Sequence, residues 1–330
     1  MSHHRQVLFE CDYRGVIPIS TAVYSVLKSA DPSQPLAIHL INDRAFIDGD
    51  GAARVREIVA RFPFATVEFH DFTPFEEKYG EVLDEKPSRW PPITWGFLFA
   101  AEVMPEVTGN IVFLDWDTFV FKDLGELFDL DLESEKLVAA AVSEATREER
   151  PDLVRCEWPV ECGPSINVGV TVINLDAFRR ERVVHTVMEW WTKYKGKTEC
   201  AEQDAFNATF GTRIKRLHPR WNHFAGWGER PIRMNPFRRF WRSNPPRLVL
   251  QAVVDPGIVH FIAGRKPWKY NHSPYRNHYR RAMIELGIIQ HDLPGETGKK
   301  KWIEGPLFDF YHWLIRLYCK TLLATFFRSR

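Results

Sequence analysis

The stretch NIVFLDWDTF, residues 110–119, joins an apolar run to two carboxylates, Asp115 and Asp117. The apolar run predicts a short buried strand over residues 110–114 that ends directly before Asp115. Residues two apart in an extended strand face the same side, so we expect the two carboxylates to lie together. They repel each other unless a cation lies between them, and their hard oxygen atoms favour Mg²⁺ or Mn²⁺. The alternative interpretation is that both residues only cap the next turn.

Upstream of this stretch, predicted strands and helices alternate. The expected strands cover residues 7–11, 36–41 and 66–70, and the expected helices cover 16–30, 52–62 and 94–104. This order predicts an α/β fold with a mostly parallel central sheet flanked by helices. Ligands bind at the carboxyl ends of the strands in such sheets. Three of the predicted strands lead into Asp12, Asp71 and Asp115.

Downstream, the pattern becomes less regular. We predict strands over residues 137–142 and 166–175, and helices over 176–194 and 202–210. A long charged connection, residues 143–165, is expected to be unstructured, which is typical of an active-site lid or of a merely mobile loop. Residues 220–246, rich in Pro, Trp and Arg, predict no regular element.

The overall charge excludes one class of partner. With 44 Lys and Arg against 43 Asp and Glu, the net charge of +1 does not favour a nucleic-acid-binding protein. Residues 213–247 nevertheless carry nine Arg and one Lys against one acid, which predicts either a solvated face or a surface for an anionic partner. The five cysteines form no CxxC pair, and no apolar run resembles a signal peptide or a membrane span. We therefore expect a cytoplasmic location.

A second motif, HFIAGRKPW at residues 260–268, follows a short apolar run. A histidine at the end of a strand can bind Mn²⁺, so His260 is a candidate ligand. Lys266, six residues later, can neutralise phosphate oxygens. A lone histidine more often makes an ordinary hydrogen bond, but the two motifs together are far more specific than either alone.

With both motifs, the chain resembles the retaining glycosyltransferases of family 8, in particular the bacterial lipopolysaccharide galactosyl- and glucosyltransferases. The likeness extends from about residue 7 to residue 268. It implies a GT-A type nucleotide-sugar-binding fold over residues 1–288, with a C-terminal helical appendage over 289–330. It further implies transfer of a hexose from a UDP-sugar to a glycan or glycolipid acceptor with retention of anomeric configuration, in a reaction that depends on Mn²⁺ or Mg²⁺.

The resemblance also implies roles for individual residues. The metal ligands would be Asp115, Asp117 and His260, with Lys266 on the diphosphate. Asp12, in the opening strand and helix, would contact the nucleoside, and Asn167 of the NVGV segment the donor sugar. The run EQDAFN, residues 202–207, would place Gln203 and Asp204 beneath the sugar, and Trp221-Asn222 matches a Trp-Asn step of the family.

Retention requires either a carboxylate nucleophile on the opposite face of the sugar or same-face attack guided by the diphosphate. Asp204 is the candidate nucleophile, whereas the neutral amide of Gln203 would support same-face attack, which we favour. Two other functions stay open. A haloacid-dehalogenase-like phosphatase also places Asp-x-Asp after a strand but needs Thr or Val where this chain has Phe119. A catalytically inactive nucleotide-sugar-binding protein would bind UDP without transfer.

The C-terminal tail carries seven basic residues against two acids over residues 299–330. Residues 306–327 predict a helix in which Asp309, His312, Arg316 and Lys320 form a narrow polar stripe on an otherwise apolar surface. Such a helix suits peripheral attachment to an anionic membrane, on the inner face if the acceptor is lipid-linked. The alternative is a helix that packs back on the catalytic domain or on another subunit.

Overall fold

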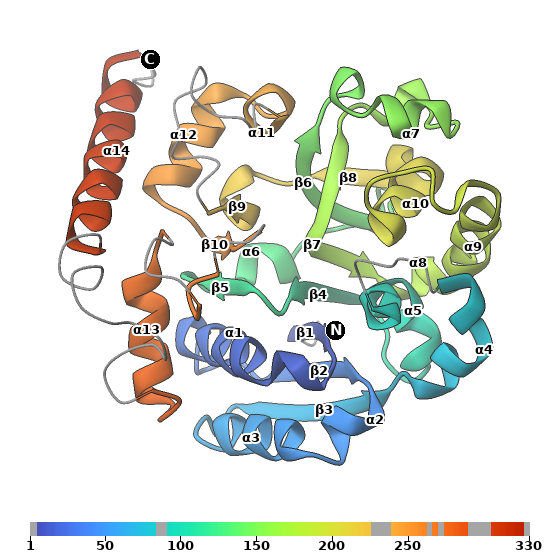
Figure 1. The fold of residues 1–330 in the computed structure, drawn as a ribbon, viewed down its shortest axis with the longest axis horizontal. Coiled ribbons are helices and arrows are strands. Elements are labelled where there is room, and N and C mark those ends of the chain that lie inside the picture. Colours follow the sequence, from blue (N-terminus) through green and yellow to red (C-terminus); the bar gives the residue numbers. More distant parts are fainter. Residues whose placement is uncertain are drawn as a thin grey trace. The chain divides into compact units, whose positions relative to one another are not determined.

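The computed structural model describes residues 5–83, 91–225, 239–262, 266–269, 274–289 and 305–326 (Figure 1). The chain divides into two compact units. The first, the sheet unit, comprises residues 1–16, 31–116 and 124–217, and the second, the C-terminal unit, comprises residues 17–30, 117–123 and 218–330. The chain therefore passes from one unit to the other between Trp116 and Asp117, inside the motif that contains both predicted carboxylates.

The sheet unit contains a seven-stranded sheet in the order β3-β2-β1-β4-β7-β6-β8. Its strands are β1 (Arg5–Cys11), β2 (Leu36–Asn42), β3 (Ala65–Asp71), β4 (Asn110–Asp115), β6 (Ala139–Ala145), β7 (Ser165–Asn174) and β8 (Ile214–Arg216). The pairs β1–β2, β2–β3, β1–β4 and β6–β8 are parallel, and β7 runs antiparallel to β4 and β6. The predicted α/β fold with a mostly parallel sheet is confirmed.

Apolar runs form the central strands because both faces of the sheet are covered. In β4, Ile111 to Leu114 are completely buried, and the ring of Phe113 stacks on Phe97 with 5.1 Å between centroids. The helices of this unit are α2 (Arg44–Ile47), α3 (Asp50–Val59), α4 (Thr73–Leu83), α5 (Gly96–Val103), α6 (Gly125–Phe128), α7 (Pro151–Arg155), α8 (Leu175–Arg180), α9 (Val183–Tyr194) and α10 (Ala201–Phe210). Short 3₁₀ turns are η1 (Tyr13–Gly15), η2 (Pro92–Trp95), η3 (Arg147–Glu149), η4 (Val160–Cys162) and η5 (Gly211–Arg213).

The three predicted acidic strand ends lie where parallel strands finish. Asp12 directly follows β1, and Asp71 and Asp115 are the last residues of β3 and β4. Because β1, β2, β3 and β4 are mutually parallel, these carboxylates mark one edge of the sheet. The strand pattern of the sequence thus places these three predicted strand-end acids at one edge of the sheet unit.

Two sequence predictions in the sheet unit are wrong. The segment 143–165 is not an unstructured loop: β6 continues to Ala145 and three short helices follow. Leu153 and Trp158 are buried there and pack with Cys162 and Ala208, so the segment has a small core of its own. The single helix expected over 176–194 is two helices, α8 and α9, because Arg182 between them has a φ of 51°, which a right-handed helix cannot include.

The C-terminal unit is built on a three-stranded sheet in the order β5-β10-β9. Its strands are β5 (Thr118–Val120), β9 (His223–Phe224) and β10 (Ile258–His260). Its helices are α1 (Val16–Ser29), η6 (Pro219–Asn222), α11 (Arg239–Ser243), α12 (Pro246–Val254), α13 (Arg276–Glu285) and α14 (Gly305–Phe326). Helix α1 is fastened to β5 because Ser25 Oγ accepts a 2.9 Å hydrogen bond from the Val120 N–H.

Three members of the polar stripe of helix α14, namely Asp309, His312 and Arg316, contact the C-terminal unit, as expected if the helix packs back on its own chain, whereas Lys320 is exposed. Asp309 pairs with Arg276 at 2.7 Å, and Arg316 donates to the Val254 carbonyl at 2.6 Å. The His312 ring packs edge-on against Tyr275. Beside these contacts, Cys319, Ile315, Leu322 and Leu323 of α14 pack with Leu250 and Val253 of α12. The helix therefore docks on its own unit (Figure 1).

Candidate functional site

The carboxylate of Asp117 lies at the edge of the small sheet in the C-terminal unit. Strand β10 pairs antiparallel with β5, which sets His260 opposite Thr118, and the Phe261 N–H donates to the Asp117 carbonyl at 3.0 Å. This register brings His260 Nε2 to 2.9 Å from Asp117 Oδ1. Lys266, just beyond the strand, places its ammonium on Asp117 Oδ2. Three predicted site residues thus converge within one unit.

A buried amide orients the imidazole of His260. The side-chain oxygen Oδ1 of Asn222, at the end of η6, lies 3.0 Å from Nδ1 of His260. An amide oxygen only accepts, so Nδ1 is assigned a proton that it donates to Asn222, and Nε2 faces Asp117. Metal-binding histidines are commonly held in this way by a partner on the other ring nitrogen. The Trp-Asn step of the sequence therefore has a physical role in this site.

The charges around Asp117 keep it ionised. Burial alone would raise its pKa, but the Lys266 ammonium and the His260 imidazole outweigh burial and hold the pKa of Asp117 well below its usual range. The side chain is nevertheless almost completely buried. A buried, ionised carboxylate beside an imidazole is suited to binding a cation.

Asp115 is tied to this cluster by the chain itself. It ends β4, and Asp117 lies in the following turn, so the prediction that both carboxylates share one strand face is wrong: the strand stops before the second. Only Trp116 separates them, which keeps their Cα atoms within about 7 Å. The short link makes Asp115 a candidate third ligand, and the predicted metal site of Asp115, Asp117 and His260 stays a prediction.

The donor atoms fit a hard divalent ion. His260 Nε2 lies 2.9 Å from the carboxylate oxygen Oδ1 of Asp117, and either a proton on Nε2 or a cation bound between the two atoms makes such a contact favourable. Neighbouring ligands of an octahedral ion with bonds of 2.0–2.1 Å are about 2.9 Å apart. The pair therefore has the spacing of adjacent ligands around Mg²⁺ or a similar ion.

A second polar cluster lies in the sheet unit, between β7 and α10. Gln203 Oε1 accepts from Asn167 Nδ2 and from the Val168 N–H, both at 3.2 Å. Gln203 Nε2 donates to Glu144 Oε2 at 2.8 Å. The sequence pattern missed Glu144, because the predicted strand stopped at residue 142 and left Glu144 in the loop. The structure places it in β6, directly bonded to a predicted site residue.

Asp204 differs from its neighbour Gln203. Its carboxylate is completely buried, and its Oδ2 lies 2.6 Å from Arg150 Nη2 and accepts from the Cys200 N–H at 2.7 Å. Burial raises the pKa of Asp204 against the lowering effect of Arg150. Arg150 is itself almost fully buried and also binds Asp152. In this arrangement Asp204 holds the start of α10 rather than facing a ligand.

Two further acids lie near the carboxyl end of β1, Glu10 within the strand and Asp12 just after it. Asp12 caps η1 by accepting from the Arg14 N–H at 2.9 Å and pairs with the Arg14 guanidinium. Glu10, in register with Asp115, is buried and accepts from the Phe97 N–H at 2.8 Å. Burial, and then the charge of Asp115, raise the pKa of Glu10 well above its ordinary value. Sequence patterning gave no signal for Glu10, which lies inside an apolar strand.

Solved structures share this architecture. A galactosyltransferase, LgtC, in complex with donor and acceptor sugar analogues aligns with a TM-score of 0.67 at 19% identity, over 90% of this chain and 99% of that chain. The apo bifunctional glycosyltransferase WbbM aligns with a TM-score of 0.64 at 18% identity, over 87% of this chain but 52% of that chain. The fold is accordingly the GT-A fold of glycosyltransferases.

The particular family follows from the sequence match. The pattern of "Glycosyl transferase family 8" matches residues 6–272, and the chain belongs to this family. General stress protein A of Bacillus subtilis (strain 168) is 26% identical over 189 residues, 55% of this chain and 60% of that protein. Probable galacturonosyltransferase-like 4 of Arabidopsis thaliana is 23% identical over 264 residues, 75% of this chain and 68% of that protein. Family membership supports a role in glycosyl transfer.

Proposed function

We propose that the protein transfers a hexose from a UDP-sugar to a glycan or glycolipid acceptor, with retention of configuration and with Mn²⁺ or Mg²⁺ bound by Asp115, Asp117 and His260. The observation that carries this proposal is the contact of His260 Nε2 with the ionised Asp117, oriented by Asn222. Family membership supports the transfer, and the LgtC structure is described with donor and acceptor sugar analogues. The phosphatase alternative has no such support.

The charges of the site suit departure of a nucleoside diphosphate. A bound divalent ion would neutralise negative charge that develops on the leaving diphosphate. Lys266, which faces Asp117 here, is the residue that we propose to contact the phosphate oxygens. Asp12, at the end of β1, is proposed to contact the nucleoside, as part of the same sheet edge.

We propose that Gln203 and Asn167 bind the donor sugar, with same-face attack guided by the diphosphate. The hydrogen bonds between these two amides, and from Gln203 to Glu144, orient them as one group. Asp204 is proposed as a positioning residue, because its carboxylate is buried against Arg150 and Cys200 and would have to break that pair to act as a nucleophile.

The decisive experiment measures UDP release from a panel of UDP-sugars with Mn²⁺, after chelation, and after Mn²⁺ is restored. Release that depends on the metal with one or more donors is expected, together with Mn²⁺-dependent binding of UDP. The Asp117→Asn variant should lose both, whereas His185→Gln, which changes an exposed histidine paired with Glu189, should keep both. UDP binding without release or transfer would identify an inactive binding protein, and release of phosphate from a generic phosphoester would restore the phosphatase hypothesis.

The outer face of α14 supports a membrane-associated acceptor. Six large side chains on this helix are exposed, namely Phe310, Tyr311, Trp313, Leu314, Leu317 and Tyr318. Since the inner face already packs on α12, this surface is available for another partner. No helix among the described residues is long and apolar enough to cross a bilayer. We propose that the protein attaches peripherally to the cytoplasmic face of a membrane, through these side chains and the exposed Lys320 of the same helix.

Sedimentation of the full chain with phosphatidylglycerol-containing vesicles tests this attachment. The variant Trp313→Ser/Leu317→Ser should bind several-fold less than the native chain, and Thr325→Ser, a change at an exposed polar position of the same helix, should bind normally. Circular dichroism checks that α14 remains folded. Equal binding of both variants, or equal binding to uncharged phosphatidylcholine vesicles, would contradict the proposal.

A further inference from the structure

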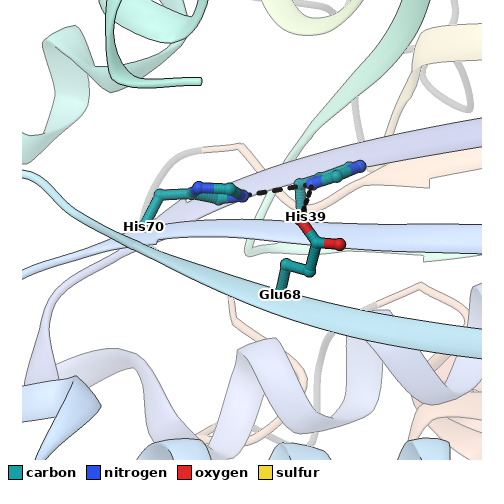
Figure 2. Close-up of side chains that lie close together, drawn as sticks. All are labelled: His39, Glu68 and His70. Carbon is teal, nitrogen blue, oxygen red and sulfur yellow. Dashed lines mark hydrogen bonds and ion pairs between the residues drawn. The ribbon is translucent and has the colours of Figure 1, made fainter. Parts of the chain in front are cut away.

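Two histidines and a glutamate converge on the sheet unit, apart from the residues that the proposed function uses. His39 comes from β2, and Glu68 and His70 come from β3 (Figure 2). The parallel register of these strands pairs His39 with Glu68, and Ile41 with His70. Because paired residues and residues two apart share one face of a sheet, all three side chains project from the same face.

The ligand atoms are close enough to share one ion. His39 Nδ1 lies 3.1 Å from His70 Nε2 and 3.6 Å from Glu68 Oε2 (Figure 2). One atom from each residue lies within 4.8 Å of the other two. In tetrahedral zinc sites, bonds of 2.0–2.2 Å place neighbouring ligand atoms about 3.3–3.6 Å apart. The two shorter separations therefore lie close to the spacing that Zn²⁺ requires.

His39 is a polar residue at an apolar position of the sheet. Its neighbours on the same face include the core residues Leu8 and Ile41. The imidazole is 3% exposed, and its Nε2 is buried without a hydrogen-bond partner among the described residues. An unsatisfied buried polar atom costs about 1–3 kcal/mol. Binding of a ligand by Nδ1 would offset this cost, which an apolar side chain at the same position would avoid.

Both imidazoles are in the state that a metal needs. Burial lowers the pKa of His39, and burial followed by the nearby His39 lowers the pKa of His70 to about 4. Neutral rings offer lone pairs at physiological pH, and when a cation takes the place of the proton shared by the two rings, that proton moves to the other nitrogen of its own ring. The exposed Glu68 adds one negative charge and leaves one side of the group open to water.

We propose that His39 Nδ1, Glu68 and His70 Nε2 bind a zinc ion, with water as the fourth ligand. Two imidazoles and one carboxylate favour Zn²⁺ over Mg²⁺ or Mn²⁺, which prefer oxygen ligands. The bound ion would connect β2 to β3, the edge strand of the seven-stranded sheet. This site is separate from the proposed catalytic ligands and does not depend on the proposed function.

Calorimetric titration of the metal-free full chain with Zn²⁺ tests the site. The Asp117→Asn variant, which lacks a proposed catalytic metal ligand, should still bind Zn²⁺ at His39, Glu68 and His70. The variants His70→Gln and Glu68→Gln should bind Zn²⁺ at this site at least tenfold more weakly. The matched control is His185→Gln, because His185 and Glu189 form a surface pair 3.3 Å apart that belongs to no group of three candidate ligands among the described residues. Excess Mn²⁺ should not displace the ion. Loss of this Zn²⁺ binding in Asp117→Asn, or unchanged affinity in His70→Gln, would overturn the proposal.

A second measurement is independent of binding stoichiometry. Zinc should raise the melting temperature of the native chain and of His185→Gln, and should not raise that of His70→Gln, because an ion that binds only the folded state stabilises it. His70 is half-buried, so its replacement is expected to fold, and unchanged circular dichroism verifies this. An equal zinc-dependent shift in all three proteins would contradict a site at His70.

Discussion

The cluster around Asp117 and the cluster around His39 use the same types of side chain in different surroundings. At Asp117, one imidazole is fixed by Asn222, and Lys266 supplies a permanent positive charge. At His39, two neutral imidazoles face each other, and the carboxylate of Glu68 is exposed. The ligand spacing is 2.9 Å in the first cluster, and 3.1 and 3.6 Å in the second.

This difference separates the chemistry that each cluster can perform. The short spacing of Asp117 and His260 suits the octahedral ion that we propose to share its remaining positions with a diphosphate. The wider, nitrogen-rich set suits a tetrahedral ion with a structural role. The neighbouring cation also differs, because Lys266, which we propose to contact an anionic substrate, has no equivalent among the described contacts of His39.

The largest expected effect is on activity. Asp117→Asn should lower kcat/KM by about 1000-fold or more, equivalent to about 4 kcal/mol, because it removes the charge that holds both the ion and His260. Glu68→Gln should leave kcat/KM within about twofold of the native value. UDP release at saturating Mn²⁺ measures both. If the two variants lost equal activity, the division of the clusters into catalytic and structural sites would fail.

The next effect is on stability and concerns the buried ion pair of Asp204 with Arg150, which belongs neither to the Asp117 cluster nor to the His39 cluster. Arg150→Met should lower the free energy of unfolding by about 3 kcal/mol, because it leaves buried charge without its partner. Arg150→Met/Asp204→Leu should recover much of that loss. Urea denaturation followed by circular dichroism measures both variants. An equally unstable double variant would show that the pair is not the source of the stability.

Removal of the amide that orients His260 tests the smaller contribution of positioning. Asn222→Ala should weaken Mn²⁺ binding by about 10- to 100-fold, because the Nδ1 proton loses its acceptor and the ring is no longer fixed. Binding of Zn²⁺ at His39 and His70 should stay the same. Titration with each metal separates the two effects, and equal weakening of both would indicate a general loss of structure.

The smallest effect is a pH dependence at His70. Its pKa is lowered from 6.5 to about 4, so the folded metal-free chain binds this proton less well than the unfolded chain. The associated stability is complete above pH 6.5 and is lost as the pH falls from 6.5 towards 4. For a half-buried group we expect a loss of about 1 kcal/mol. Urea midpoints at pH 7.5 and 4.5 should fall less in His70→Gln than in the native chain; parallel declines would refute the assignment.

The sequence predicted the parts of the site that depend on local order. Apolar runs alternating with amphipathic segments indicated the parallel strands, and the residue after each run located Asp12, Asp71 and Asp115 at one sheet edge. The residues of the proposed metal site lie in two motifs that are each contiguous in the sequence, which is why the sequence alone predicts them. Errors occurred where the local pattern was ambiguous: residues 176–194 have helical periodicity throughout, and only the φ of Arg182 divides them.

By itself, the sequence determined the fold class, the family motifs and the identity of the proposed metal ligands, because these follow from hydrophobic periodicity and from short motifs. Only the tertiary structure decided which distant side chains meet: Lys266 with Asp117, Glu144 with Gln203, and His39 with Glu68 and His70. It also decided that Asp309, His312 and Arg316 of α14 contact the C-terminal unit. The reason is that strand register and helix docking depend on packing between segments far apart in the chain, and shifting a register by one residue reverses the face on which every side chain lies.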